Sequence, residues 1–419
     1  MEKKTYTCID MKSFFASVEC VDRGLDPMTT NLVVADPSRG NGAICLAITP
    51  AMKALGIRNR CRIYEIPESV SYITALPRMK RYMEVSANIY STYLKYISPD
   101  DIHVYSVDEC FLDVTSYLKP YNKTAKEMVQ MLTQAVFKET GVTATAGIGS
   151  NLFLAKVALD ITAKHVDDHI GILDEASFKA TLWNHQPITD IWGIGHGIAA
   201  RLEKYGAYDL YGITQIDEKV LYKEFGINAE YLIDHANGIE PCTIKEIHDY
   251  KSKSSSLSNG QILFEDYKYD DALLVMKEMV DLLTLDLVEK HLVIDSVSMS
   301  VGYASETDKS TGGSRKFGDF TNSYKKIVGH IEDLYRETTK TFTPIRRLNI
   351  SFNNLHDDAM ETFSLFDDVE SDAKEKKLQE TVISIKNRYG KNAVLKGMSY
   401  QEKATARKRN KLVGGHNSE

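Results

Sequence analysis

Residues 5–20 read T-Y-T-C-I-D-M-K-S-F-F-A-S-V-E-C. The first part, over residues 4–10, is rich in residues that favour extended structure and predicts a short strand. A helix over 12–23 follows, and its apolar residues are Phe14, Phe15, Val18 and Cys20. A strand that is followed directly by a helix leaves Asp10 at the strand's end, and this placement decides how the first domain is interpreted.

A second acidic segment reads Y-S-V-D-E-C-F-L-D-V and contains Asp108 and Glu109. Strand-like runs flank the two acids at 102–107 and 110–114, which predicts a hairpin with both acids at its tip. If these strands lie beside the strand that ends at Asp10, three carboxylates converge. They would repel one another unless a cation neutralised them, and oxygen ligands without His or Cys favour Mg²⁺. Two Mg²⁺ ions could then serve phosphoryl transfer, whereas the alternative is a solvated acidic turn.

The rest of the first 165 residues extends this domain. A small inserted subdomain is expected at about 30–75, with strands at 32–35 and 43–48. Further helices are expected at 77–96, 123–138 and 151–164, with a strand at 143–148. This mixture of elements indicates an α+β domain with an antiparallel sheet.

The pattern changes after Pro187, where short helices are joined by glycine turns. A polar segment at 251–256 resembles a linker. Beyond it, a second α+β domain is predicted, with strands at 256–263, 293–303 and 345–352 and helices at 269–289 and 323–340. The tail from about residue 356 begins acidic and ends basic.

Composition sets broad limits on the protein. The chain has 419 residues, 43% of them hydrophobic, and a formal net charge of −7, which predicts two to four globular domains and excludes wholesale disorder. The acidic balance argues against a uniformly basic surface for nucleic acid, although net charge does not report how charge is distributed. Six cysteines without a C-x-x-C pair favour a reducing, cytoplasmic compartment. We expect no signal peptide and no membrane association, because no apolar run is long enough.

Five motifs in the correct order resemble the Y-family (UmuC-like, translesion) DNA polymerases. They are I-D-M-K-S-F-F-A-S-V-E at 9–19, Y-S-V-D-E-C-F-L-D-V at 105–114, G-I-G-S-N-L-F-L-A-K-V-A-L-D at 147–160, W-G-I-G at 192–195 and P-I-R-R-L-N-I-S-F at 344–352. The ending A-T-A-R-K-R-N-K-L-V-G-G-H at 404–416 is similar to the UmuC-like UV-resistance proteins of Gram-positive bacteria.

The resemblance implies a multidomain α+β fold arranged as a right-hand polymerase. Its parts would be a palm at 1–27 and 76–170, small fingers at 28–75, a helical thumb with a helix-hairpin-helix at 171–240, a linker at 241–254, an α+β little finger at 255–355 and a C-terminal tail at 356–419.

The resemblance also implies the catalytic residues. Asp10, Asp108 and Glu109 would hold two Mg²⁺ ions, with the backbone carbonyl of Met11 as a further ligand. Phe15 stands where the family has the aromatic residue that selects the sugar, since a ring packed under C2′ leaves no room for a ribose hydroxyl. Phe14 is assigned to the nucleotide site beside it, and the alternative for Phe15 is an ordinary core phenylalanine.

The residues expected to hold the triphosphate depart in part from the family pattern. The family usually has a tyrosine, and an arginine three residues later, where this chain has Pro50 and Lys53. A lysine can still act as a point charge on phosphate, but without the bidentate geometry of arginine. Lys156 matches the family's palm lysine. Ala163 occupies the place of a second palm lysine, so Lys164, one residue later, is assigned instead.

DNA contacts are implied in two domains. Gly193 and Gly195 resemble the glycines of a helix-hairpin-helix, in which backbone N–H groups meet DNA phosphate. In the little finger the implied DNA-binding residues are Lys253, Arg346 and Arg347. Strand alternation would put the two arginines on opposite faces unless the strand bulges.

The acidic start of the tail contains T-F-S-L-F at 362–366, which resembles the Q-L-x-L-F peptide by which bacterial polymerases bind the sliding clamp. Thr stands in place of Gln, and Phe363, Leu365 and Phe366 would contact the clamp. The alternative is that this peptide docks on the protein's own surface.

The sequence therefore predicts a template-directed, error-prone DNA polymerase for DNA damage tolerance and the SOS response, with primer–template DNA and dNTP as substrates. Whether a recombinase filament or small accessory subunits are required stays open. A palm-fold nucleotide cyclase is a rival, but it predicts a G-G-D-E-F-like hairpin and no DNA-binding module. A non-catalytic DNA-bound scaffold recruited by the clamp would fit the loss of an acid, yet all three acids are present.

Overall fold

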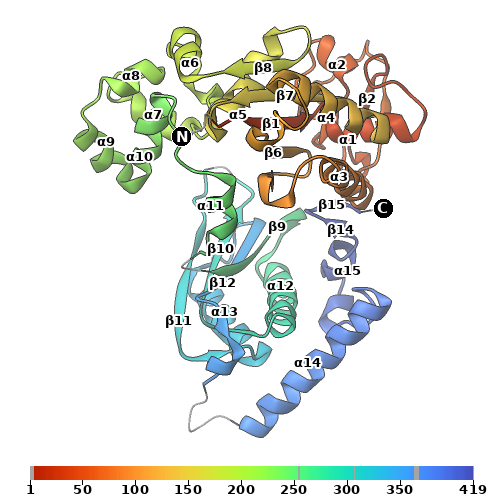
Figure 1. Ribbon diagram of the computed structural model, residues 1–419. Helices are drawn as coiled ribbons and strands as arrows, with labels where there is room; N and C mark the ends of the chain where they lie inside the picture. The colour runs from red at the N-terminus through yellow and green to blue at the C-terminus, as the bar shows by residue number, and fades with distance from the viewer. Residues whose placement is uncertain (1–3, 253–254, 306, 363–367, 419) are drawn as a thin grey trace. The chain divides into compact units, whose positions relative to one another are not determined.

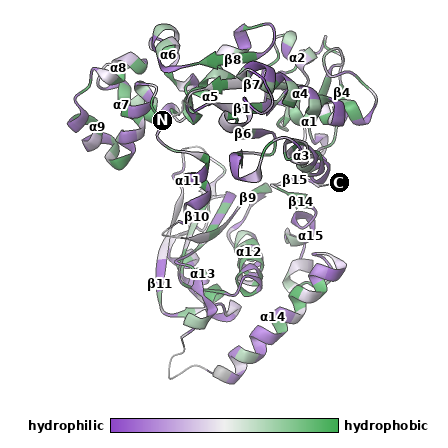
Figure 2. Ribbon diagram, viewed as in Figure 1, coloured by the Kyte–Doolittle hydropathy of each residue, from purple (hydrophilic) through white to green (hydrophobic). Residues whose placement is uncertain are grey.

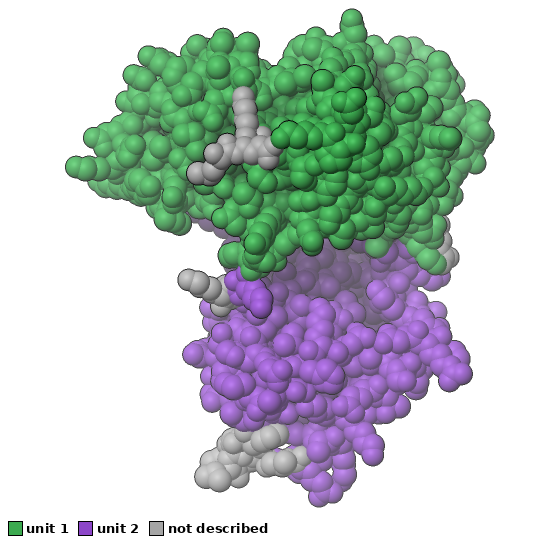
Figure 3. Space-filling view, in the orientation of Figure 1, with its two compact units in different colours: residues 1–250, 419 green, residues 251–418 purple. Residues whose placement is uncertain are grey.

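The structure is a computed structural model that describes residues 4–252, 255–305, 307–362 and 368–418. The chain forms two compact units that meet in sequence between Tyr250 and Lys251 (Figure 3). None of the helices in the described ranges has the length and apolarity that a bilayer crossing demands.

The first unit is built on a five-stranded sheet with the order β5-β6-β1-β7-β8 (Figure 1). Its strands are β1 (Tyr6–Met11), β5 (Ile102–Val104), β6 (Glu109–Asp113), β7 (Ala144–Gly149) and β8 (Ile170–Leu173). Strands β7 and β8 run parallel, and the other neighbours are antiparallel. The predicted antiparallel sheet therefore gains a parallel edge strand, β8, which the sequence pattern did not indicate.

Helices cover both faces of this sheet. One core joins β1 and β6 to α1 (Phe14–Asp22), α3 (Met79–Tyr93) and α4 (Ala125–Thr140). On the other face lies α5 (Leu152–Asp160), whose residues from Leu152 to Leu159 are all buried and mostly green in Figure 2. Because β1 alternates, Ile9 and Met11 face the first layer, whereas Cys8 faces α5.

Glycine brings α5 close to the sheet. A Cβ on Gly147 would lie 2.1 Å from the backbone oxygen of Ala155, and a Cβ on Gly149 would lie 2.2 Å from the nitrogen of the same residue. Any larger residue would push the helix away from β7. Asn151 starts the helix, because its side chain accepts a hydrogen bond from the Leu154 N–H at 2.8 Å. The G-I-G-S-N motif thus fixes the distance between α5 and the strands that carry the acids.

The inserted subdomain is a three-stranded sheet with the order β3-β2-β4. Its elements are β2 (Leu32–Val34), β3 (Ala47–Ile48), α2 (Pro50–Ala54) and β4 (Ile73–Ala75). The strand predicted over 43–48 is shorter than expected. Residue Ile44 makes only an isolated bridge with Arg62, and its side chain is 43% exposed.

Short helices complete the first unit. They are α6 (Glu175–Leu182), α7 (His196–Glu203), α8 (Leu210–Thr214), α9 (Glu218–Phe225), α10 (Ala229–Ala236) and α11 (Ile244–Asp249). Helix α11 lies inside the predicted linker at 241–254, and Ile244 is buried against Tyr6 and Leu152. That part of the linker prediction is wrong, because the buried isoleucine attaches α11 to the first unit.

The second unit contains a four-stranded antiparallel sheet with the order β11-β10-β12-β9. The strands are β9 (Ser256–Tyr267), β10 (Leu292–Tyr303), β11 (Thr311–Thr321) and β12 (Ile345–Asn353), with a short strand β13 (His356–Asp357) paired to β10. Helices α12 (Tyr269–Glu289) and α13 (Tyr324–Thr338) pack on one face. Strand β11 was not predicted, because its sequence T-G-G-S-R-K-F-G-D-F-T lacks apolar alternation.

The C-terminal segment is ordered beyond the predicted little finger. It forms α14 (Val369–Tyr389), α15 (Ala406–Arg409) and a hairpin of β14 (Leu412–Val413) and β15 (His416–Asn417). Buried Glu278 of α12 accepts hydrogen bonds from the N–H groups of Thr405 at 2.7 Å and Ala406 at 3.0 Å. Arg409 donates to Gln261 at 2.9 Å and Asn259 at 2.7 Å. The basic end of the chain is therefore a packed part of the second unit.

Candidate active site

Asp10 and Glu109 face each other across the two central strands of the first unit. Strand β1 pairs with β6 so that Asp10 lies opposite Glu109. Asp108 immediately precedes β6, and its backbone carbonyl accepts a hydrogen bond from the Met11 N–H at 3.0 Å. Residues on the same face of these strands pack beneath α5, namely Tyr6, Cys8 and Phe111. The fold thus brings Asp10 and Glu109 to one end of the β1–β6 pair, on the α5 side, and Asp108 precedes Glu109 at the same end.

Glu109 is held by two partners on that face. The Nζ of buried Lys156, in α5, lies 2.8 Å from Glu109 Oε1. The thiol of Cys8 also donates to Glu109 Oε1, at a sulfur–oxygen distance of 2.9 Å. A second carboxylate, Asp160, lies 3.0 Å from the same Nζ. Burial favours a neutral Lys156, but these two carboxylates more than offset it, so the pKa of the lysine is raised and it stays charged.

No ion pair with Asp10 is found among the described residues, and the nearby charge of Lys156 offsets only part of its burial and repulsion. Burial, followed by the charges of Asp108 and Glu109, raises the pKa of Asp10 to about 8. A divalent cation would stabilise the ionised form of this carboxyl and offset its repulsion from the two other acids. The donors available here are hard oxygens, which suit Mg²⁺. The residue types present therefore fit a magnesium site.

The side chains do not form a closed metal cage. Among the described residues, no three His, Cys, Asp or Glu side chains stand close enough together to ligate one ion. Asp108 Oδ1 accepts a hydrogen bond from Ser106 Oγ at 2.6 Å, and Glu109 is engaged by Lys156. Lys156 and Cys8 both bind Glu109 Oε1, so a metal ion bound through that oxygen would compete with them. The carbonyl of Met11 stays a predicted ligand.

Phe15 lies in the first turn of α1, beside the acids in sequence. Its ring stacks on Tyr82 of α3, with centroids 4.4 Å apart and an interplanar angle of 15°. Phe14 is only 3% exposed and belongs to the palm core. The assignment of the Phe14 side chain to the nucleotide site is therefore not supported. Its ring is buried in the core, so only the backbone of Phe14 could contact a nucleotide.

Two further lysines flank the acids. Lys53 is exposed at the end of α2 in the inserted subdomain, and it lies within electrostatic range of both Asp10 and Lys164. Pro50 begins α2, where its missing N–H costs nothing. Ala163 is fully buried, whereas Lys164 is exposed. The assignment of Lys164 to the triphosphate stays a prediction.

The glycine motif of the thumb forms a turn before a short helix. Gly193 has a φ of 88°, a left-handed conformation that favours glycine, and Gly195 is the N-cap residue of α7. Trp192 precedes them and donates its ring N–H to the hydroxyl of Tyr105 at 3.1 Å. The turn is thereby tied to the segment that leads into the acidic hairpin. DNA contact by the two glycines stays a prediction.

Both arginines of β12 are exposed, because a register shift opposite Ile345 and Arg347 interrupts the alternation. Arg346 pairs with Asp266 at 3.1 Å. Arg347 has no ion-pair partner among the described residues, and it shares the face opposite α12 and α13 with Asn349, Ser351 and Asn353. Of the two arginines, Arg347 is the better candidate for a phosphate contact. Lys253 lies outside the described residues.

The three clamp-peptide residues, Phe363, Leu365 and Phe366, also lie outside the described residues. Thr362, at the start of the peptide, is described. Its N–H donates to the Phe320 carbonyl at 3.1 Å, and its hydroxyl accepts from the Phe320 N–H at 2.7 Å. The threonine that replaces the family's glutamine is therefore bonded to β11, an edge strand of the second unit.

Sequence reasoning missed three residues that contact the candidate site residues, directly or through one neighbour. Cys8 binds Glu109, Tyr82 stacks on Phe15, and Glu19 accepts a hydrogen bond from the Tyr82 hydroxyl. The first strand's alternation does place Cys8 and Asp10 on one face, and that signal could have identified Cys8. Tyr82 comes from a helix more than 60 residues away, and no local pattern indicates its partner.

Comparisons with known proteins agree along the chain. Residues 9–160 match the impB/mucB/samB family, and residues 254–365 match the C-terminal domain of that family. A putative UV-damage repair protein, UvrX, of Bacillus subtilis is 30% identical over 99% of this chain and 98% of its own length. A DNA polymerase IV of the same organism is 30% identical, and one of Halalkalibacterium halodurans is 29% identical, each over 99% of both chains.

A solved Y-family DNA polymerase chimera has the same fold. It superposes with a TM-score of 0.64 at 22% sequence identity and covers 84% of this chain and 99% of its own. The expected multidomain α+β architecture of a right-hand polymerase is thus confirmed at the level of the fold. Together with the two family matches and the full-length relatives, it shows that the chain belongs to the impB/mucB/samB family, the family of UmuC-like Y-family DNA polymerases.

Proposed function

We propose that this protein is a template-directed DNA polymerase of the translesion type, which transfers a nucleotide from dNTP to a primer 3′ hydroxyl with two Mg²⁺ ions. The observation that carries the proposal is the pairing of Asp10 with Glu109 beside Asp108, together with the raised pKa of Asp10. The relatives named as DNA polymerase IV support the reaction type. A non-catalytic scaffold is not favoured, because the chain keeps all three acids and two of its full-length relatives are named as DNA polymerases.

The chain's own residues would divide the work of the reaction. Asp10, Asp108 and Glu109 would hold the metal ions, which supply Lewis-acid activation of the phosphate and of the attacking hydroxyl. Lys53 and Lys164 would bind the triphosphate as point charges. Lys156 Nζ lies 2.8 Å from Glu109 Oε1 and balances its charge. When Glu109 binds metal, Lys156 would turn toward the triphosphate. Phe15 would lie under the sugar and exclude ribonucleotides.

The biological role we propose is DNA damage tolerance within an SOS response. The relative named as a putative UV-damage repair protein supports it. The peptide at 362–366 would recruit the sliding clamp, and a recombinase filament or small accessory subunits could act with it. We place the protein in the cytoplasm, where DNA is its substrate and where its six cysteines, all free in the structure, would stay reduced.

Primer extension tests the proposed reaction directly. The purified protein is expected to extend a labelled primer on a DNA template with the four dNTPs, and only when Mg²⁺ is present. The templated base should decide which dNTP is added. A chelator should stop extension, and renewed Mg²⁺ should restore it. Metal-independent addition, or addition that ignores the template, would contradict the proposal.

Replacing Phe15 with alanine is expected to admit ribonucleotides. The substitution removes the ring that would meet a 2′ hydroxyl, so the preference for dNTP over rNTP should fall at least about tenfold. A tenfold change corresponds to about 1.4 kcal/mol of steric discrimination. The preference is measured as the ratio of kcat/KM for dNTP to that for rNTP opposite one templating base. Phe137→Ala is the matched control, since Phe137 is 51% exposed on α4.

A further inference from the structure

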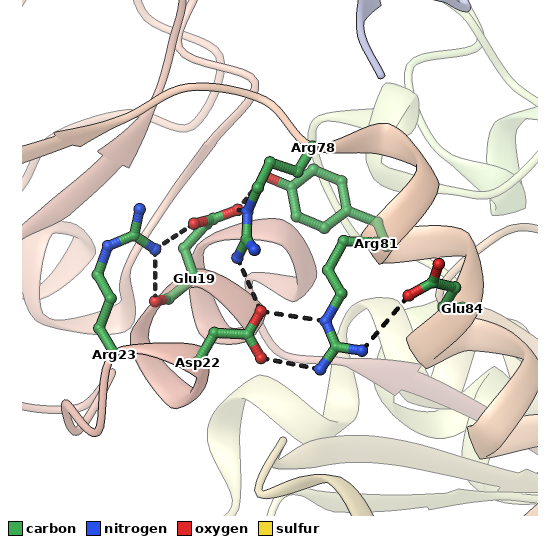
Figure 4. A network of polar contacts seen from close by, with 7 residues as sticks. Glu19, Asp22, Arg23, Arg78, Arg81 and Glu84 are labelled. Atoms are coloured by element: carbon green, nitrogen blue, oxygen red, sulfur yellow. Dashed lines mark hydrogen bonds and ion pairs between the residues drawn. The ribbon is translucent and has the colours of Figure 1, made fainter. Parts of the chain in front are cut away.

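A buried carboxylate lies one helical turn beyond Phe15. Glu19 of α1 is 0% exposed, and its two oxygens accept hydrogen bonds from three side chains (Figure 4). Arg78 Nε lies 2.8 Å from Oε1, the hydroxyl of Tyr82 lies 2.8 Å from the same oxygen, and Arg23 binds Oε2. A charge buried this completely persists only when its partners compensate it fully.

The network continues to the helix surface. Asp22 accepts from Arg78 at 2.7 Å and from two nitrogens of Arg81 at 2.9 Å and 3.1 Å, and Arg81 lies 3.5 Å from Glu84 (Figure 4). Helix α1 precedes the inserted subdomain and α3 follows it. The two arginines that bind Glu19 therefore come from the two ends of that insertion, and Glu19 joins both ends to α1.

The hydroxyl of Tyr82 connects this network to Phe15. Tyr82 is fully buried, its ring is parallel to that of Phe15 within 15°, and its hydroxyl is bound by Glu19. Burial favours a protonated Glu19, but the hydrogen bonds from Arg78, Arg23 and Tyr82 more than offset it, and the pKa of Glu19 is lowered. Glu19 is thus a charged acceptor, and charge-assisted hydrogen bonds hold their geometry most firmly.

We propose that Glu19 is a positioning residue for sugar selection. By accepting a hydrogen bond from the Tyr82 hydroxyl, it holds the tyrosine ring against the Phe15 ring. The position of the Phe15 ring under the sugar is thereby fixed. The inference rests on the proposed role of Phe15. A ring that can tilt leaves space for a 2′ hydroxyl part of the time, whereas a ring clamped from behind does not.

Two conservative variants test this role. Tyr82→Phe keeps the ring and deletes only the hydroxyl, and Glu19→Gln keeps the shape of the side chain and deletes its charge. Each is expected to lower the ratio of kcat/KM for dNTP to that for rNTP about fivefold, the effect of one lost hydrogen bond. The double variant is expected to lose no more than the larger single effect, because both changes break the same contact.

The controls separate this role from simple stability and from the role of Phe15. Glu84→Gln changes the outer part of the network only, and the ratio should stay at the wild-type value. If Phe15→Ala lowers the ratio while Tyr82→Phe and Glu19→Gln leave it unchanged, Glu19 does not position the ring and the role of Phe15 stands. If Phe15→Ala leaves the ratio unchanged, both the role of Phe15 and this inference are overturned. Should Glu19→Gln fail to fold, Tyr82→Phe decides alone.

Discussion

Replacing Asp108 with alanine is expected to lower Mg²⁺-dependent primer extension by about 1,000-fold or more. Metal ions that stabilise the charge of phosphoryl transfer contribute several kcal/mol, and each 1.36 kcal/mol changes the rate tenfold. Asp108 precedes β6 directly, and its backbone is bonded to that of Met11. A methyl group there removes the proposed metal ligand without removing this backbone hydrogen bond. The rate of single-nucleotide addition at saturating Mg²⁺ measures the effect.

The matched control is Asp100→Ala, which removes an exposed aspartate from the same unit. Its extension rate should equal that of the wild-type protein, and neither variant should melt below the wild-type temperature, since the charge of Asp108 is unfavourable to ionised Asp10. Extension by Asp108→Ala at more than one tenth of the wild-type rate would contradict the assignment of Asp108 as a metal ligand. Loss of activity in the control would instead assign the effect to the fold.

Elements with a clear apolar period could be predicted from the sequence, and elements without one could not. Helix α12 was expected at 269–289 and has those bounds, because its apolar residues recur on one face that packs on the second sheet. Strand β11 is rich in glycine and polar residues, and only its pairing with β10 makes it a strand. Helix α14 was missed because it is polar on most sides, and Gln379 is its one buried residue among those described.

The acidic residues of the site could be predicted because they follow from local patterns. Asp10 ends a strand and Asp108 and Glu109 adjoin another, so a short register argument brings them together. The contacts of Lys156 and Tyr82 could not be predicted, because they depend on how α5 and α3 pack on the sheet. Periodicity locates a residue on a face of its own element, but the partner that it meets is set by tertiary packing.

The basic end of the chain shows that a count of charges does not locate a binding surface. Several of its basic residues are neutralised within the second unit. Lys396 lies 2.9 Å from Asp281, Lys403 lies 2.6 Å from Glu265, and Arg409 binds two side chains of β9. These cations attach the segment to the sheet and to α12. The net charge of a segment therefore does not report how many of its cations are free to meet phosphate.

Replacing Asp10 with asparagine is expected to stabilise the metal-free protein at high pH. Burial and the charges of Asp108 and Glu109 raise the pKa of Asp10 to about 8, against an ordinary value of 3.8. Between these two values the folded state binds more protons than the unfolded state, so the free energy of unfolding falls as the pH rises. Above pH 8 the ionised carboxylate costs the fold roughly 3–5 kcal/mol, and asparagine does not carry this cost.

Urea unfolding in a chelator at pH 5, 7 and 9 measures this difference. The variant should already be somewhat more stable than the wild-type protein at pH 5, because Asp10 is protonated in the folded state but mostly ionised in the unfolded state, and its advantage should grow to several kcal/mol at pH 9. Added Mg²⁺ should stabilise the wild-type protein at pH 9 and have little effect on the variant, since binding to the folded state alone raises its stability. If the stability of Asp10→Asn follows that of the wild-type protein at every pH, the charge imbalance at Asp10 is contradicted. Asp100→Asn is the control, and its stability should follow that of the wild-type protein. A variant that gained stability but kept the response to Mg²⁺ would show that Asp108 and Glu109 hold the ion without Asp10. The experiment therefore measures how much the proposed metal ligand Asp10 lowers the free energy of unfolding, independently of the polymerase reaction.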